Sequence, residues 1–295
     1  MTGDQVPPSR ATPVLDRLLA TVAAQAGAEN FPVALRVLPR GPRDKLSRVY
    51  GYARFVDDIG DEASGDRLAL LDLVEHDVRA LWSSTSLDSV DPPRLPIIAA
   101  LGPVLDDGHM PIQPFLDLIE ANRVDQRVHS YPDFDALLGY CRLSAAPVGR
   151  IVLHIAHAAD DRNIADADAV CAALQVLEHC QDVGEDAAAG RVYLPADELA
   201  AAGVAARDLS ASQTSAPLRH VLAAQVERAL ELLRPGRGLV RRLTGWSRVA
   251  VAGYVAGGLA TADTLRAHDF DVLAASLGPS KLRTATHALR LIAGR

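Results

Sequence analysis

The feature that most constrains this chain is helical periodicity, which runs from about Val14 onward without a clear stretch of strand alternation. Short segments rich in Pro, Gly, Ser and Asp, such as residues 235–238, break the periodic stretches, and none is long enough for an interdomain linker. Aromatic residues make up only 4% while Ala and Leu recur, which favours helix over strand. We therefore expect an all-α chain: a disordered tail over residues 1–13, then one bundle of roughly eight to ten helices over residues 14–295.

Charge and cysteine content narrow the class of protein. A net charge of -7 argues against a nucleic-acid binder, which normally carries a basic excess. The three cysteines lack metal-binding spacing and are too few for a disulfide scaffold, so a reduced, cytoplasmic chain is the simplest interpretation. The apolar stretch Val249–Ala262 is too short to span a bilayer. The basic run Arg234–Arg242 is interpreted as solvated surface, with a patch facing the inner membrane as the alternative.

The first chemically informative segment, residues 48–62, reads RVYGYARFVDDIGDE. On a helix, steps of four, three and four residues place Tyr50, Arg54, Asp57 and Asp61 on one face. Carboxylates four residues apart repel each other unless a cation lies between them, and Mg²⁺ suits such a site because substrate phosphate and water complete its shell. Arg54 could then bind phosphate oxygens. The alternative is a solvated helix face.

A second acidic segment follows, in which Asp182 lies 125 residues after Asp57. Gln175, Glu178, Asp182 and Asp186 step by three, four and four, which predicts one polar stripe on a single helix. A buried acidic stripe is costly unless it is paired or binds metal. With two such helices in one chain, we favour a facing metal-diphosphate site over two independent solvated stripes.

Three segments carry a family resemblance: YGYARFVDDIGDE, LLGYCRLSAAPVG and LQVLEHCQDVGEDAAAGRVYLP. In this order and separation they resemble the squalene and phytoene synthase family along nearly the whole chain. The segment AENFPVALRVLPR, with Asn30 and Phe31 where condensing relatives usually read Ser-Phe, looks most like the bacterial hydroxysqualene synthases within that family. The resemblance implies a single-domain class I isoprenoid (terpenoid) synthase bundle with a central cavity.

The resemblance also assigns roles to residues. The catalytic positions that it implies are Asp57, Asp58, Asp61, Glu62, Asp182, Asp186 and Tyr193. The resemblance also implies positions that bind the substrate, at the diphosphate, at a third polar site and in the prenyl pocket. These positions are Tyr50, Arg54, Asp125, Gln126, Arg191, Asn30, Phe31, Tyr140, Ala145, Gly149 and Gln175. The metal ligands would be Asp57, Asp61, Glu178, Asp182 and Asp186. Glu178 departs from the family, which usually has Asn there, so its carboxylate would either replace the amide as a metal ligand or change the metal-diphosphate geometry that is bound.

The function expected from this resemblance is conversion of presqualene diphosphate to hydroxysqualene with Mg²⁺ or Mn²⁺. NADPH is not expected, since the chain lacks a glycine-rich dinucleotide motif. The rivals are a head-to-head condensing prenyltransferase that makes presqualene diphosphate or phytoene, and a non-catalytic relative. The expected partner is a prenyl diphosphate substrate, with peripheral membrane contact and handover to other squalene-pathway enzymes left open.

Several histidines are not assigned to the site. His154 and His157 lack a third ligand for zinc, so they are interpreted as an ordinary packed or surface pair. His179 and Cys180 are interpreted as packing residues that point away from the acidic stripe. Pro147 is expected to kink a helix.

Overall fold

The computed structural model describes residues 38–83, 93–105 and 109–294, and every regular element in these ranges is helical. The one β-bridge recorded there joins Ser130 and Val192. The all-α prediction is therefore confirmed. The expected tail, residues 1–13, lies outside the described residues, as do Asn30 and Phe31.

The chain divides into two compact units. Of the described residues, those up to 127 together with 154–157 form unit 1, and those in 128–153 and from 158 onward form unit 2. The expectation of one domain over residues 14–295 stays a prediction.

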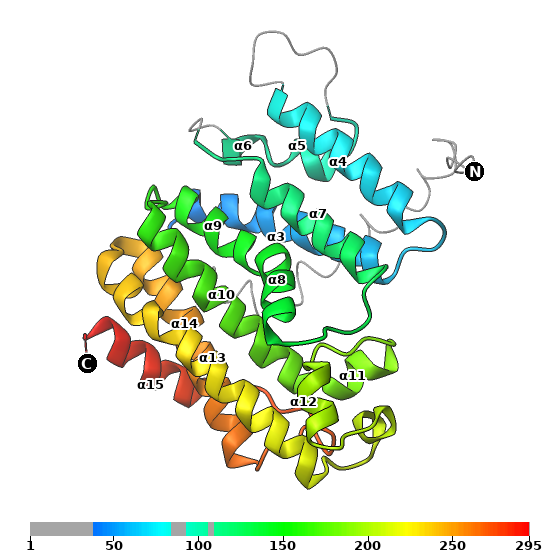
Figure 1. The fold of residues 1–295 in the computed structure, drawn as a ribbon. Helices are drawn as coiled ribbons and strands as arrows, with labels where there is room; N and C mark the ends of the chain where they lie inside the picture. The colour runs from blue at the N-terminus through cyan, green and yellow to red at the C-terminus, as the bar shows by residue number, and fades with distance from the viewer. Residues whose placement is uncertain (1–37, 84–92, 106–108, 295) are drawn as a thin grey trace. The chain divides into compact units, whose positions relative to one another are not determined.

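Unit 1 is built around helix α3, against which α4 and α7 pack (Figure 1). The helices of this unit are α3 (Arg40–Asp61), α4 (Arg67–Ser83), α5 (Pro96–Ala99), α6 (Gly102–Leu105) and α7 (Gln113–Asp125). Tyr52 and Phe115 are fully buried at the α3–α7 contact, and the Tyr52 hydroxyl donates a hydrogen bond of 2.8 Å to the Phe115 carbonyl. That bond satisfies a polar group that would otherwise be costly to bury.

Unit 2 is a stack in which α10 packs along α13, α13 along α14, and α14 along α15 (Figure 1). Its helices are α8 (Phe134–Ser144), α9 (Ala146–Ile155, of which residues 154 and 155 fall in unit 1), α10 (Asp161–Gln181), α11 (Val183–Ala188), α12 (Ala196–Ala201), the 3₁₀ helix η1 (Ala206–Ser210), α13 (Ala216–Arg242), α14 (Gly245–Ala267) and α15 (Lys281–Ile292). Gly258 permits the close approach of these helices, since a Cβ there would lie 2.8 Å from Leu174.

The expected break at residues 235–238 is wrong, because α13 runs through it with Pro235 inside the helix. Tertiary packing overrides the local signal. Gly236 is buried, and a Cβ at this position would lie 2.7 Å from Val255 and 2.9 Å from Val170. The neighbouring helices therefore hold this turn in place despite the hydrogen bond that proline cannot donate. Pro147 lies in the first turn of α9, and the helix is interrupted at Ala145, two residues before it, where a proline is expected to disturb the preceding turn.

One helical stretch among the described residues, Phe134–Ile155, is long and apolar enough to cross a membrane by length and composition. Within its most apolar window 44% is buried, and the core helix of a soluble protein meets the same criterion.

Candidate active site

The acidic face of α3 has the predicted arrangement. Val49, Val56 and Ile59 are buried on one side of the helix, while Asp57 and Asp61 are exposed on another. A shared helix thus places both carboxylates one turn apart on an accessible surface. Glu62, which caps the helix, is also exposed, and Tyr50 is half-buried.

Arg54 and Asp58 form an ion pair on the same helix. The Arg54 Nε lies 2.9 Å from the Asp58 Oδ1, and the Asp58 side chain is only 2% exposed. Burial raises the pKa of Asp58, while the positive charge of Arg54 opposes this shift. The ion pair therefore orients the guanidinium along α3, and Asp58 lies among the packed residues.

Asn122 of α7, which the sequence analysis did not identify, lies against Asp57. Its amide Nδ2 donates to Asp57 Oδ1 at 3.0 Å and to the Leu118 carbonyl at 3.1 Å, and the residue is buried. Gly60 makes this approach possible, because a Cβ there would lie 2.0 Å from Asn122 Oδ1. The contact fixes the orientation of one carboxylate of the acidic pair.

The environment of Asp57 changes its protonation. The residue keeps contact with solvent, but the surrounding protein reduces hydration of the carboxyl and raises its pKa to about 6. The Asn122 hydrogen bond opposes the increase, and the negative charge of Asp61 adds to it. A cation bound at the carboxyl would favour the ionised form.

Gln126, predicted to contact substrate, has both ends of its amide engaged within unit 1. Its Nε2 donates to the Gly60 carbonyl at 3.0 Å, and its Oε1 accepts from Arg67 Nη1 at 3.4 Å. Arg67 also donates to the Gly60 carbonyl at 2.8 Å. These bonds hold the last turn of α3, where Asp61 lies. Asp125, the other member of the predicted third polar site, is the last residue of α7 and is partly exposed.

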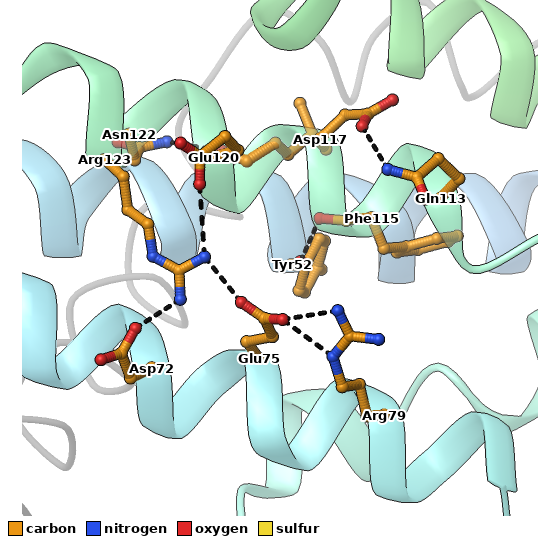
Figure 2. Close-up of polar contacts among 11 residues, drawn as sticks. Tyr52, Asp72, Glu75, Arg79, Gln113, Phe115, Asp117, Glu120, Asn122 and Arg123 are labelled. Carbon is orange, nitrogen blue, oxygen red and sulfur yellow. Dashed lines mark hydrogen bonds and ion pairs between the residues drawn. The ribbon is translucent and has the colours of Figure 1, made fainter.

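Arg123 joins α7 to α4 through a network of ion pairs shown in Figure 2. Its guanidinium lies 2.5 Å from Asp72 and 2.6 Å from Glu75, and Glu75 also pairs with Arg79 at 2.7 Å. Burial tends to raise the pKa of Glu75, but the hydrogen bonds from both arginines outweigh it and lower the pKa. The network supports α7, the helix that carries Asn122.

In unit 2 the predicted acidic stripe is divided between two helices, so the expectation of one continuous helix is wrong. α10 ends at Gln181, Asp182 has non-helical dihedral angles, and α11 begins at Val183. The turn still continues locally, since the Asp186 N–H donates to the Asp182 carbonyl at 2.8 Å. Asp182 therefore lies at the junction.

Carboxylates crowd this junction. Desolvation raises the pKa of Asp182 to about 6, and the negative charges of Glu178, Asp186 and Glu185 add to the increase. Burial also raises the pKa of Glu178, and His179 opposes this shift. These pKa shifts are those expected where several acidic groups lie close together without a bound cation.

His179 was expected to point away from the acidic stripe, and this expectation is wrong. Its Nδ1 lies 3.7 Å from Asp186 Oδ2, and its Nε2 lies 3.3 Å from Gln175 Nε2. Its ring stacks on Tyr193 with centroids 3.8 Å apart and an interplanar angle of 10°. Helical spacing itself explains the contact, because Gln175, Asp182 and Asp186 lie four, three and seven residues from His179 and so share its face of the helix. Cys180, its neighbour, is fully buried, as expected of a packing residue.

Tyr193 belongs to an aromatic cluster with Tyr131 and Tyr140. Its ring centroid lies 5.8 Å from that of Tyr131 and 5.5 Å from that of Tyr140. The Val192 N–H donates to the His129 carbonyl at 2.8 Å and holds the two loops together. Tyr140, expected from the resemblance to line the prenyl pocket, packs in this cluster, and its pocket role stays a prediction.

Arg191 lies beside the same loop. Its backbone N–H donates to the Asp186 carbonyl at 2.9 Å, and the residue is partly exposed. The last turn of α11 therefore places the arginine next to the acidic junction.

An apolar cavity within unit 2 brings four of the predicted residues together. Its volume is about 200 Å³, and Ala145, Gly149, Gln175 and Glu178 are among its lining residues. Much of the remaining lining is aliphatic, and it includes Ser144, Val148, Val152, Leu153, Ala167, Val170, Cys171, Leu174, Leu239, Val251 and Tyr254. The cavity therefore joins an apolar interior to a carboxylate at the start of the acidic junction.

The acidic motifs predict a divalent cation, and the oxygen ligands present bear on whether one fits. Among the described residues, no three His, Cys, Asp or Glu side chains converge as a ready metal site. The carboxylate pairs nevertheless fit a hard cation that takes one or two carboxylates and completes its shell with water and phosphate. Asp186 Oδ2 lies 3.7 Å from His179 Nδ1 but has no hydrogen-bond partner among the described residues, so this oxygen has a lone pair that a cation could use.

The helical elements of the described residues, the two acidic segments and the apolar cavity agree with the terpenoid synthase helical fold, the fold class of isoprenoid synthases to which the solved structure of a squalene synthase also points. Comparison with known proteins narrows this class. The chain belongs to the squalene/phytoene synthase family, whose model matches residues 24–291. It is thus an isoprenoid-synthase enzyme of a family that acts on prenyl diphosphates.

Three relatives illustrate the similarity. The hydroxysqualene synthase of Rhodopseudomonas palustris is 36% identical over 219 residues, which cover 73% of this chain and 71% of that protein. The phytoene synthase of Mycobacterium bovis is 34% identical over 185 residues, which cover 62% and 58%. The crystal structure of the squalene synthase HpnC from Alicyclobacillus acidocaldarius matches with a TM-score of 0.76 and 36% identity, and the match covers 90% of this chain and 98% of that one.

Proposed function

We propose that this protein converts presqualene diphosphate to hydroxysqualene in squalene and hopanoid biosynthesis. The observation that carries the proposal is the cavity of unit 2, where an aliphatic interior meets Glu178. A prenyl diphosphate has the same division, with a hydrocarbon chain at one end and an anionic group at the other. The similarity to hydroxysqualene synthases supports this choice of substrate.

The residues divide the chemistry between them. Asp57 and Asp61 on α3, and Glu178, Asp182 and Asp186 at the α10–α11 junction, would hold Mg²⁺ or Mn²⁺. The cation would supply charge stabilisation for the departing diphosphate. Arg54 and Arg191 would bind phosphate oxygens, since guanidinium groups suit that geometry. The aliphatic walls of the cavity would hold the prenyl chains and restrict the access of water to the carbocation.

The second candidate function is head-to-head condensation of two allylic diphosphates. The phytoene synthase relative favours it, and the same carboxylates would serve it. The two reactions differ in substrate and product, so one set of incubations separates them.

The test incubates the purified full chain with Mg²⁺ and either presqualene diphosphate or farnesyl diphosphate, with and without NADPH, and identifies products by mass spectrometry. We expect hydroxysqualene from presqualene diphosphate alone, no change on adding NADPH, and loss of activity in EDTA. Consumption of farnesyl diphosphate with release of presqualene diphosphate or phytoene would instead establish the condensing reaction. Full activity in EDTA would contradict the metal requirement.

A further inference from the structure

Basic residues are concentrated at the C-terminal end of unit 2. Residues 232–262 contain five arginines and no Asp or Glu, and residues 272–295 contain four basic residues and no Asp or Glu. The chain as a whole carries a net charge of -7. These two segments include the end of α13, most of α14, and α15, which pack against one another (Figure 1). The face that they form is therefore cationic on an acidic protein.

Helix α15 exposes apolar side chains on this face. Leu282 is 78% exposed and Leu289 is 68% exposed, the highest values among the large hydrophobic residues that the structure describes. They are seven residues apart and so lie on one side of the helix, opposite the buried Leu291. Arg283 and Arg290 lie about a quarter turn from them. Leucines between basic side chains are typical of a helix that lies in a membrane interface.

A groove beside α15 has matching chemistry. Its volume is about 290 Å³, and the buried residues Leu233, Val255 and Leu291 line its floor. Arg234, Arg237, His287 and Arg290 also line it. Arg234 pairs with Glu231 and His287 with Asp263, whereas no acidic side chain of the described residues pairs with Arg237 or Arg290. An apolar floor beside unpaired guanidinium groups suits an anionic amphiphile.

We propose that the α13–α15 face binds the surface of an anionic lipid bilayer, with Leu282 and Leu289 inserted and an acidic headgroup held by Arg237 and Arg290. Charge complementarity carries the choice of occupant. A neutral bilayer could bury the leucines but offers no negative charge to the arginines. An acidic protein surface could pair with the arginines but offers no apolar interior in which to bury the leucines. The inference goes beyond the catalysed reaction and does not depend on it.

The first experiment measures flotation of the full chain with vesicles. One set contains equal amounts of phosphatidylglycerol and phosphatidylcholine, and the other contains phosphatidylcholine alone. We expect binding to the anionic vesicles that weakens as sodium chloride increases, because salt screens surface charge. Equal binding to both vesicle types, or none to either, would overturn the proposal.

The second experiment uses paired variants. The double variant Arg237→Gln/Arg290→Gln should lower the partition coefficient between anionic vesicles and water by about 25-fold. This is about fivefold for each basic residue near the membrane surface. Leu282→Ser with Leu289→Ser should lower it by about tenfold or more. The matched controls are Arg207→Gln, whose side chain is 87% exposed on η1, and Leu73→Ser, which is 37% exposed on α4. Both controls should bind as the wild type does, and circular dichroism should show unchanged helicity in all variants.

Two outcomes would assign the face to another occupant. If inorganic phosphate releases the protein from vesicles more than chloride does at the same ionic strength, the arginines bind a free anion. If light scattering shows a dimer that the double Leu→Ser variant dissociates, the leucines form an interface between two copies of the chain. Either result overturns the bilayer assignment, as does a double Arg→Gln variant that binds like the wild type.

Discussion

The contact between Gly60 and Asn122 supports a quantitative prediction about the acidic face of α3. In Gly60→Ala the new Cβ would lie 2.0 Å from Asn122 Oδ1 and 3.0 Å from its Cγ, so the amide must move. Overpacking of this kind costs about 1–3 kcal/mol. Moving the amide also removes the hydrogen bond to Asp57, worth about 1 kcal/mol. The higher helix propensity of alanine offsets up to about 1 kcal/mol of this loss in the free energy of unfolding.

The net expectation for Gly60→Ala is a loss of about 1–3 kcal/mol in the free energy of unfolding. In an Asn122→Ala background the two closest obstructing atoms are absent, and only the Cβ at position 122 remains, 3.3 Å from the new Cβ. A small shift relieves that contact, so the same change should be neutral or stabilise by up to about 1 kcal/mol. The two substitutions should therefore be coupled by about 1–4 kcal/mol.

Urea denaturation of the wild type, the two single variants and the double variant, followed by circular dichroism, measures this coupling. The metal-free protein in EDTA is the appropriate state, since a bound cation would add its own contribution to stability. Additive effects, with a coupling below about 0.5 kcal/mol, would refute the role assigned to Gly60.

Three further predictions concern the acidic residues. Asp57→Ala or Asp61→Ala should lower turnover by at least about 10²-fold with unchanged helicity, and activity within a few-fold of the wild type would exclude a metal-ligand role. Glu178→Gln should raise the Mg²⁺ concentration needed for activity, because the amide keeps the shape and loses the charge; a titration that superimposes on the wild type would exclude Glu178 as a ligand. The pKa of Asp57 is raised to about 6, so the folded state binds this proton more tightly than the unfolded state and gains stability as the pH falls from 7 to 5. In EDTA, Asp57→Asn should therefore lose stability relative to the wild type over that range, and a constant difference would contradict the shift.

The parts of the structure that depend on local spacing were predictable. The α3 face follows from the positions of Arg54, Asp57 and Asp61 on one helix, and the structure has this arrangement. Asn122 could not be found in this way, because it contacts Asp57 across 65 residues of sequence. The one local hint was Gly60 within a helical pattern, since such a glycine often marks a close approach.

In the second acidic segment, helical spacing did not predict the end of the helix. A step of four residues predicts that Asp182 and Asp186 share a helix, but the chain leaves helical geometry at Asp182. His179 lies beside Asp186, as a step of seven residues allows, and it stacks on Tyr193, whose loop is fixed by the hydrogen bond between His129 and Val192. That hydrogen bond joins residues about 60 positions apart, so the periodicity of α10 does not report it.

The three cysteines have a practical consequence for chemical labelling. Burial raises the pKa of Cys141, Cys171 and Cys180 to about 12 in each case. At neutral pH only about one thiol in 10⁵ is then ionised, and the thiolate is the form that attacks maleimides. A cysteine introduced at the exposed Leu282 would have an ordinary pKa and react far faster. A polarity-sensitive dye could thus be attached at one chosen position without first replacing the natural thiols.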